Sequence, residues 1–180
     1  GLILINVPAV WAAGDSGQGV VLANVDGGAQ WRHPDLINNI WNNLGEDANG
    51  NGITVLPNGT FDPGDVNGID DDNNGKIDDF LGWNFSNNSN DPSTSSNSHG
   101  TSTAGILVGD GTNGTQTGVA PRAKLMDLNI NTAGESGWWA AYQYAFENGA
   151  DVTTSSYSLK WPSNPNYPMF RQINDMELAA

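Results

Sequence analysis

The chain contains no cysteine and has few basic residues. Without Cys among its 180 residues, it can form neither a disulfide framework nor a Cys-ligated zinc module. Its 6 Lys and Arg residues stand against 20 Asp and Glu, so the formal net charge is −14 and no basic stripe is available to neutralise phosphates. We therefore expect neither nucleic acid nor an anionic membrane surface as a partner.

Long hydrophobic runs are also missing. The longest apolar stretch joins residues 2–5 to residues 7–13, and Pro8 interrupts it, so it is too short to span a bilayer. It lacks the basic flank with which a signal peptide begins. The composition is rich in Gly, Asn and Asp, poor in Lys and free of Cys. Such a composition is typical of a secreted bacterial-type protein, and we expect an extracellular location.

Three short apolar segments predict strands within one domain. A chain of this length buries roughly 70% of the surface that its unfolded form exposes, which is enough for a core. Residues 19–25 form a β-branched run between turn residues that ends at Asp26. Residues 124–130 and 151–155 predict two further strands.

Helices are expected between and after these strands. One begins at Ser98 or His99 and ends near Gly109, and a second covers residues 137–148. Strand, helix and strand in this order form a βαβ crossover, so the strands are parallel and helices cover the sheet. The sequence therefore predicts an α/β fold. A further amphipathic helix is expected over residues 169–180.

Two polar residues at the ends of these elements indicate acid–base chemistry. Asp26 ends a predicted strand, and the carboxyl ends of parallel strands are where such sheets gather functional groups. His99 starts a predicted helix. A carboxylate that fixes the tautomer of an imidazole makes the imidazole a general base, so we predict Asp26 and His99 as a catalytic pair.

Four sequence blocks carry a resemblance to a known family. These blocks resemble segments of the subtilisin-like serine proteases (peptidase S8 family). They are residues 19–28 with 33–36, residues 99–106, residues 118–125 and residues 148–152. The resemblance implies a doubly wound, mostly parallel sheet with helices on both faces, and a secreted endopeptidase that acts on polypeptides. In such an enzyme Asp26 orients His99, and His99 activates a serine.

The chain departs from the family pattern at several points. Gly27 replaces a Thr or Ser whose hydroxyl could support Asp26, and Ser102 replaces a second His. The family's nucleophile block and oxyanion-hole Asn are expected beyond Ala180. Residues 1–180 are thus predicted to be the N-terminal portion of a single catalytic domain, with the remainder of that domain as a partner. Alone, this portion should have little peptidase activity.

Residues 100–104 superficially match the nucleophile block, but we do not assign Ser102 as the nucleophile. It lies three residues after His99 in the same predicted helix, and a nucleophile must approach its base from a separate element. Two alternatives stay open. One is a non-catalytic calcium-binding or protein-interaction module that retains a protease-like fold, and the other is a serine supplied in trans by a separate chain.

The resemblance also implies a substrate-binding strand at Ser156, Tyr157 and Ser158. An extended peptide would pair with the backbone of this strand by β-augmentation. Ser158 stands where the family has Gly, so it adds a side chain where substrate approaches. A plain core or edge strand is the alternative interpretation.

The segment 46–79 carries nine acids and one Lys, which predicts a loop too polar to form a core. The predicted calcium ligands, placed with the spacing of an EF-hand-like loop, are Asp70, Asp72, Asn74, the Lys76 carbonyl, Asp78 and Asp79. Leu81 replaces the bidentate Glu of a full EF-hand, and residues 47–53 repeat the early spacing without later acids. A solvated acidic loop is the alternative, but nine neighbouring acids repel one another unless cations neutralise them.

Overall fold

A computed structural model of the chain describes residues 1–94, 99–112, 114, 117–156, 168–169, 171–172 and 175. Its helices and strands are α1 (Val7–Ala12), β1 (Val21–Asp26), β2 (Gly82–Asn84), α2 (His99–Val108), β3 (Lys124–Asn129), α3 (Gly134–Glu147) and β4 (Val152–Thr154). The acidic segment belongs to the long connection between β1 and β2. This connection contains two short 3-10 helices, Ile37–Asn39 and Leu44–Glu46.

The four strands form one parallel sheet with the order β2-β3-β1-β4. The central strands β1 and β3 pair over their whole length, with Val21 opposite Lys124 and Asp26 opposite Asn129. Because the strands run in the same direction, their carboxyl ends meet at one edge of the sheet, and Asp26 lies there. The predicted α/β fold with a parallel sheet is confirmed.

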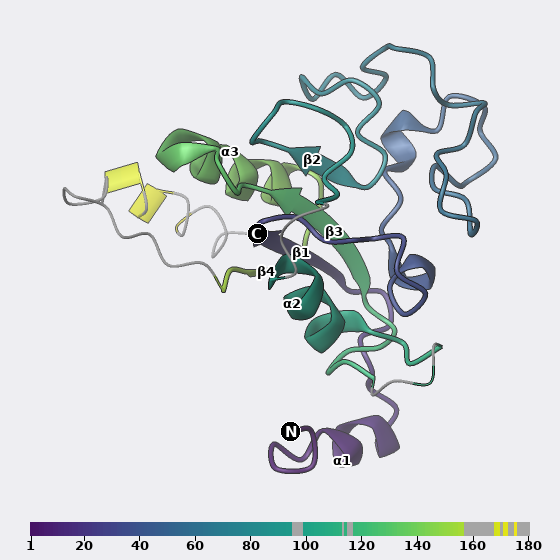
Figure 1. Cartoon of the computed structure of the whole chain (residues 1–180), viewed down its shortest axis with the longest axis vertical. Helices are drawn as coiled ribbons and strands as arrows, with labels where there is room; N and C mark the ends of the chain where they lie inside the picture. The colour runs from purple at the N-terminus through teal and green to yellow at the C-terminus, as the bar shows by residue number, and fades with distance from the viewer. Residues whose placement is uncertain are drawn as a thin grey trace.

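Helices cover both faces of this sheet (Figure 1). On one face, α2 packs over Leu22 and Leu125. On the other face, α3 packs over the neighbouring residues Ala23 and Met126. Successive side chains of a strand point to opposite faces, so Asp26, four residues after Leu22, lies on the α2 face. The hydrophobic pattern of β1 therefore decides which helix can reach its last residue.

Helix α3 starts earlier than the sequence indicates. The sequence places its first residue at Gly137, whereas the helix begins at Gly134. Gly137 lies inside the first turn and does not mark the start of the helix. A Cβ at this position would lie 2.5 Å from the Cβ of Ala133, so a glycine is needed there for packing. Helix α2 begins at His99 as predicted. Most of the helix predicted over residues 169–180 lies outside the described residues.

Substitutions of two glycines in α2 would test how closely this helix packs on the rest of the fold. A Cβ added at Gly100 would lie 2.2 Å from the carbonyl oxygen of Gly28, whereas Gly105 faces open space. We expect Gly100→Ala to lower the free energy of unfolding by about 1–3 kcal/mol, since a backbone atom cannot rotate away from the added methyl group. Gly105→Ala should raise it by up to about 1 kcal/mol, because Ala is the better helix former. Urea denaturation measures both effects, and equal effects would contradict this packing.

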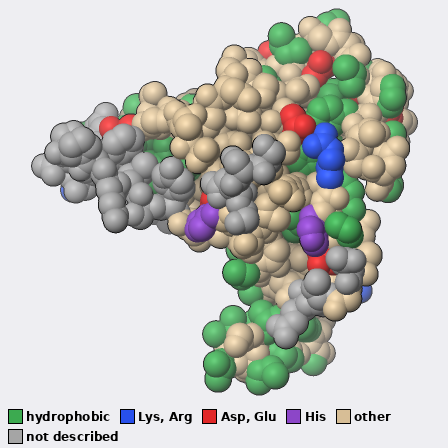
Figure 2. Space-filling view, viewed as in Figure 1, with side chains coloured by type: hydrophobic (Ala, Val, Ile, Leu, Met, Phe, Trp, Pro, Cys, Tyr) green, Lys and Arg blue, Asp and Glu red, His purple; other side chains and the backbone are tan. Residues whose placement is uncertain are grey.

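The N-terminal helix α1 lies apart from the sheet, at the bottom of Figure 1. Hydrophobic side chains gather at this end of the molecule in Figure 2, and Leu4 is 89% exposed. Trp11 connects the helix to the body by donating from Nε1 to the carbonyl oxygen of Val119 at 3.0 Å. Within the part of the chain that the structure describes, no helix is long and apolar enough to cross a bilayer.

Candidate active site

The predicted pair of Asp26 and His99 lies together at the carboxyl end of β1. Asp26 is the last residue of the strand and is fully buried, and His99 is the first residue of α2. His99 Nδ1 lies 2.8 Å from Asp26 Oδ1. The two elements can approach this closely because Gly100 packs directly on the backbone of Gly28.

Both carboxylate oxygens of Asp26 have further hydrogen-bond donors. The Gly27 N–H donates to Oδ1 at 2.6 Å, and the Thr103 hydroxyl lies 3.3 Å from Oδ2. Gly27 cannot offer the hydroxyl that the family pattern places after the Asp. In this chain the Thr103 hydroxyl, one helical turn after His99, lies 2.9 Å from the Gly100 carbonyl oxygen and 3.3 Å from Asp26 Oδ2, so its single proton is shared between these two acceptors. Thr103 was not predicted from the sequence, although its position four residues after His99 puts both residues on one side of a helix.

This arrangement can perform acid–base chemistry. The side chain of His99 is half exposed, while that of Asp26 has no exposed surface. With the carboxylate facing Nδ1, the ring holds its proton on that atom, and Nε2 on the opposite edge can accept one. The buried negative charge also stabilises the imidazolium that forms when Nε2 takes up a proton.

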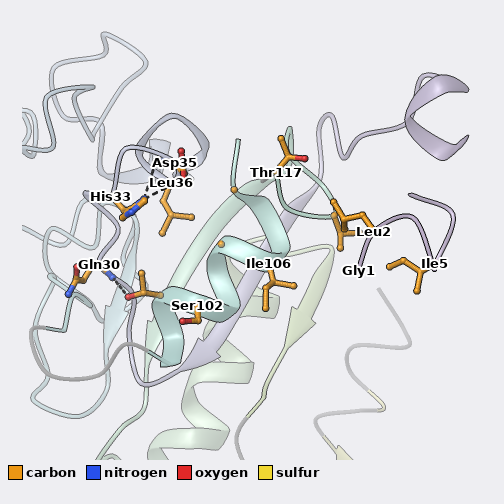
Figure 3. Close-up of a pocket in the computed structure, with 14 residues that line it drawn as sticks. Gly1, Leu2, Ile5, Gln30, His33, Asp35, Leu36, Ser102, Ile106 and Thr117 are labelled. Carbon is orange, nitrogen blue, oxygen red and sulfur yellow. Dashed lines mark hydrogen bonds and ion pairs between the residues drawn. The ribbon is translucent and has the colours of Figure 1, made fainter. Parts of the chain in front are cut away.

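The other histidine of the chain lies elsewhere on the same face of the molecule (Figure 2). His33 and Ser102 both line a cavity of about 630 Å³ between α2, the turn after β1 and the N-terminal segment (Figure 3). Neither Asp26 nor His99 lines this cavity. His33 Nδ1 accepts a hydrogen bond from the Asp35 N–H at 3.2 Å, so the ring stabilises a local turn.

Of the predicted substrate-binding residues, the structure describes only Ser156. It is exposed and follows β4, which pairs in parallel with β1. Tyr157 and Ser158 lie outside the described residues. Because β4 is at one end of the strand order, Ser156 lies next to an edge of the described sheet.

Three carboxylates of the acidic segment converge, and we call Glu46, Asp72 and Asp79 the Glu46 cluster. Each offers an oxygen within 4.8 Å of the other two. Glu46 and Asp79 have no exposed surface. Burial, together with the neighbouring negative charges, raises the pKa of Glu46 to about 7 and that of Asp79 to about 6. The hydroxyl of Tyr144 in α3 donates a hydrogen bond to Asp79.

The Glu46 cluster has the chemistry of a site for a hard cation. Its donors are carboxylate oxygens, which Ca²⁺ and Mg²⁺ prefer. No Lys or Arg in the described ranges forms an ion pair with any of the three acids. A divalent cation would neutralise the repulsion between them and would remove the cost of burying their charges.

The structure divides the predicted calcium ligands into two groups. Asp72 and Asp79 belong to the Glu46 cluster. Asn74 contacts this cluster, because its Nδ2 donates to Asp72 Oδ2 at 3.1 Å and to Asp79 Oδ2 at 3.0 Å. Asp70 and Asp78 are not among the three converging carboxylates, and their side-chain oxygens accept backbone N–H groups of the loop. The Lys76 ammonium lies 5.5 Å from the centre of the Trp83 ring. Glu46 was not predicted as a ligand because it ends a 3-10 helix far before the loop, where ligand spacing cannot point to it.

A second buried carboxylate, which was not predicted from the sequence, lies near Asp26. Asp127 stands opposite Asn24 in the register of β1 and β3, and it has no exposed surface. One of its oxygens accepts the Ala29 N–H at 2.8 Å, and the other has no hydrogen-bond partner among the described residues. Burial, and then the negative charges of Asp26 and Asp91, raises the pKa of Asp127 to about 7.

We expect Asp127→Asn to raise the free energy of unfolding at pH 8 by about 1–3 kcal/mol, because the amide carries no charge to bury. The ordinary Asp pKa is 3.8, so between about pH 4 and pH 7 the folded protein holds a proton that the unfolded chain has released. Wild-type stability should fall as the pH rises through this range, and the Asn variant should lack this fall. Thermal melts at saturating calcium, with the exposed Asp15→Asn as control, measure the slopes. Equal slopes for all three proteins would contradict the prediction.

Known proteins resemble this chain in sequence and in fold. The sequence profile of the Subtilase family matches residues 17–177. Subtilisin-like protease 1 of Plasmodium vivax is 34% identical over 145 residues, which cover 78% of this chain and 20% of that protein. The major intracellular serine protease of Bacillus subtilis (strain 168) is 29% identical over 169 residues, 91% of this chain and 41% of that protein. The crystal structure of MycP1 without its N-terminal propeptide aligns with a TM-score of 0.56 at 18% identity, over 97% of this chain and 44% of that one.

Proposed function

Since the chain belongs to the subtilase family of serine peptidases, we propose that residues 1–180 form the N-terminal portion of one catalytic domain that cleaves peptide bonds. The observation that supports this most directly is the 2.8 Å contact between His99 Nδ1 and Asp26 Oδ1. The chain spans 14% to 41% of the length of the curated relatives it matches. We expect the serine nucleophile and the oxyanion-hole Asn after Ala180.

In the proposed mechanism Asp26 orients the base and His99 moves the proton. His99 Nε2 accepts the proton of the serine hydroxyl as the serine oxygen attacks the substrate carbonyl, and Asp26 stabilises the imidazolium. The same Nε2 then gives the proton to the departing amine. We also propose that an extended peptide would pair with the backbone of the segment Ser156, Tyr157 and Ser158, which follows β4.

The proposal is tested by comparing this chain with a longer version that includes the serine. The 180-residue chain should hydrolyse a chromogenic peptide at least about 10³-fold more slowly, since every catalytic route through a triad needs its nucleophile. Intact-mass measurement of the sample checks that no second fragment supplies a serine in trans. Comparable turnover by the two versions would refute the proposal, and a reading frame without such a serine would favour a non-catalytic calcium-binding module.

We further propose that the Glu46 cluster holds a structural Ca²⁺ ion. The donor set supports this, because three carboxylates supply the charge and the oxygens that the ion prefers. The hydrogen bond from Tyr144 to Asp79 would then connect the ion to α3. The ion would order the acidic segment, and the proton transfers would stay with Asp26 and His99.

An extracellular location completes the proposal. The composition, rich in Gly, Asn and Asp and poor in Lys, supports it. Fractionation of the source culture tests it, because the protein should accumulate in the medium. Recovery only from the cell lysate would overturn the location and leave the peptidase assignment untouched.

A further inference from the structure

A second group of oxygen donors lies in the acidic segment and shares no residue with the Glu46 cluster. Asp47, Asn49 and Asn51 stand at positions 1, 3 and 5 of an EF-hand-like spacing. Gly52 follows at position 6 with a φ of 83°, the left-handed conformation that a sharp turn requires. No acid follows at position 9, where Val55 stands. The residues of the loop alone therefore supply too few carboxylates for a complete EF-hand-like site.

A hairpin returns the missing acids to this loop. Val55 and Phe61 form an antiparallel bridge, so the chain reverses direction directly after the loop. Asp62 and Asp65 follow this bridge. The Asp62 N–H donates to the carbonyl oxygen of Thr54 at 2.9 Å, which fixes the returning segment beside the outgoing one.

Hydrogen bonds show that the returning acids meet the loop. Asn51 Nδ2 donates to Asp62 Oδ2 at 2.6 Å. The Asn49 N–H donates to Asp65 Oδ1 at 3.1 Å. Two side chains from the returning segment thus lie against two alternate residues of the loop.

Asp65 provides the independent evidence for a ligand. Its side chain has no exposed surface, and its Oδ2 is buried without a hydrogen-bond partner among the described residues. Burial, and then the charges of Asp62 and Asp47, raises the pKa of its carboxyl. No Lys, Arg or His of the described ranges forms an ion pair with these three acids. A buried carboxylate oxygen without a donor is costly unless a cation meets it.

We propose a second calcium site, the hairpin site, formed by Asp47, Asn49, Asn51, Asp62 and Asp65. Carboxylate and amide oxygens suit Ca²⁺, which takes about six to eight oxygen ligands in flexible geometry, whereas Mg²⁺ demands a near-ideal octahedron and keeps several waters. Ligands that come from a loop and from a separate hairpin favour the more tolerant ion. The proposal is independent of peptidase activity.

Calcium stoichiometry separates the hairpin site from the Glu46 cluster. We expect the 180-residue protein, equilibrated with Ca²⁺ and assayed by atomic absorption, to bind two ions. Asp65→Asn should bind one ion, because the amide can still accept the Asn49 N–H but supplies no charge. Asp79→Asn should also bind one, and the double variant none. Asp71→Asn, an exposed acid of the same segment that belongs to neither site, should bind two.

The backbone amides of Asn49 and Gly52 locate the ion. Their NMR signals should shift on addition of Ca²⁺ to the wild type and to Asp79→Asn, but not to Asp65→Asn. Far-UV circular dichroism of the calcium-free variants checks folding, and Asp47→Asn, at a half-buried position, is the second variant that must lose the same ion. A wild type that binds no calcium overturns the proposal. The proposal is also overturned if Asp65→Asn binds as many calcium ions as the wild type, whatever the Glu46 cluster binds.

Discussion

Asp26→Asn is expected to lower kcat by about 10⁴-fold in the longer version that includes the nucleophilic serine, which is the loss known for the triad aspartate of serine proteases. The Asn amide can present an N–H to His99 Nδ1, which places the ring proton on Nε2 and removes the base. KM should change little, because Asp26 is fully buried and its side chain cannot touch substrate. Steady-state kinetics with a chromogenic peptide separates the two parameters.

Two further variants make this test specific. The chain offers a matched control in Asp35→Asn, because Asp35 lies 4.0 Å from the other histidine, His33. This variant should keep a kcat near that of the wild type. Thr103→Val removes the hydroxyl beside Asp26 Oδ2 and should lower kcat by about tenfold, which corresponds to one hydrogen bond of about 1.4 kcal/mol. If Asp26→Asn retained activity similar to that of Asp35→Asn, the catalytic pair would be assigned wrongly.

Chelation of calcium at pH 8 is expected to lower the Tm by about 10 °C. A ligand at about 1,000 times its Kd stabilises the folded state by about 4 kcal/mol. For a protein of this size, each kcal/mol moves the Tm by about 2–4 °C. The effect is large because Glu46 and Asp79 are buried and would remain as neighbouring, unneutralised charges. Thermal melts in EDTA and in excess Ca²⁺, at low salt, measure the difference.

The same chelation should have little effect at pH 5. The pKa of Glu46 is raised from 4.5 to about 7, and that of Asp79 from 3.8 to about 6. The calcium-free folded protein therefore holds protons that the unfolded chain has released, and its stability falls as the pH rises from about 4 to about 7. Ca²⁺ needs the ionised carboxylates, so protons compete with it at pH 5.

Glu46→Gln isolates the contribution of the Glu46 cluster. Without calcium at pH 8 it should melt above the wild type, since it buries one charge fewer, and it should respond less to added Ca²⁺. Asp71→Asn should respond like the wild type. A wild-type Tm that chelation leaves unchanged at pH 8 and low salt would show that no calcium is bound.

Local patterns in the sequence were sufficient to predict the elements that carry Asp26 and His99. The β-branched run before Asp26 and the helix that begins at His99 depend on side-chain periods and end signals within a few residues. The boundary of α3 was less predictable. Gly137 looked like a helix start, but its role is a packing contact inside the first turn, and no local pattern distinguishes these two uses of a glycine.

Contacts between distant parts of the chain depend on how the elements pack, and local patterns could not predict them. Thr103 reaches Asp26 because α2 packs on β1, and Asp127 lies near the same site because β3 pairs with β1 in one register. Glu46 joins Asp72 and Asp79 because the acidic loop folds back onto a 3-10 helix. The α/β elements, and the positions of Asp26 and His99 at their ends, could be predicted from the sequence because both follow from neighbouring residues. Which further side chains surround them depends on strand register and loop closure, and these are properties of the whole folded chain.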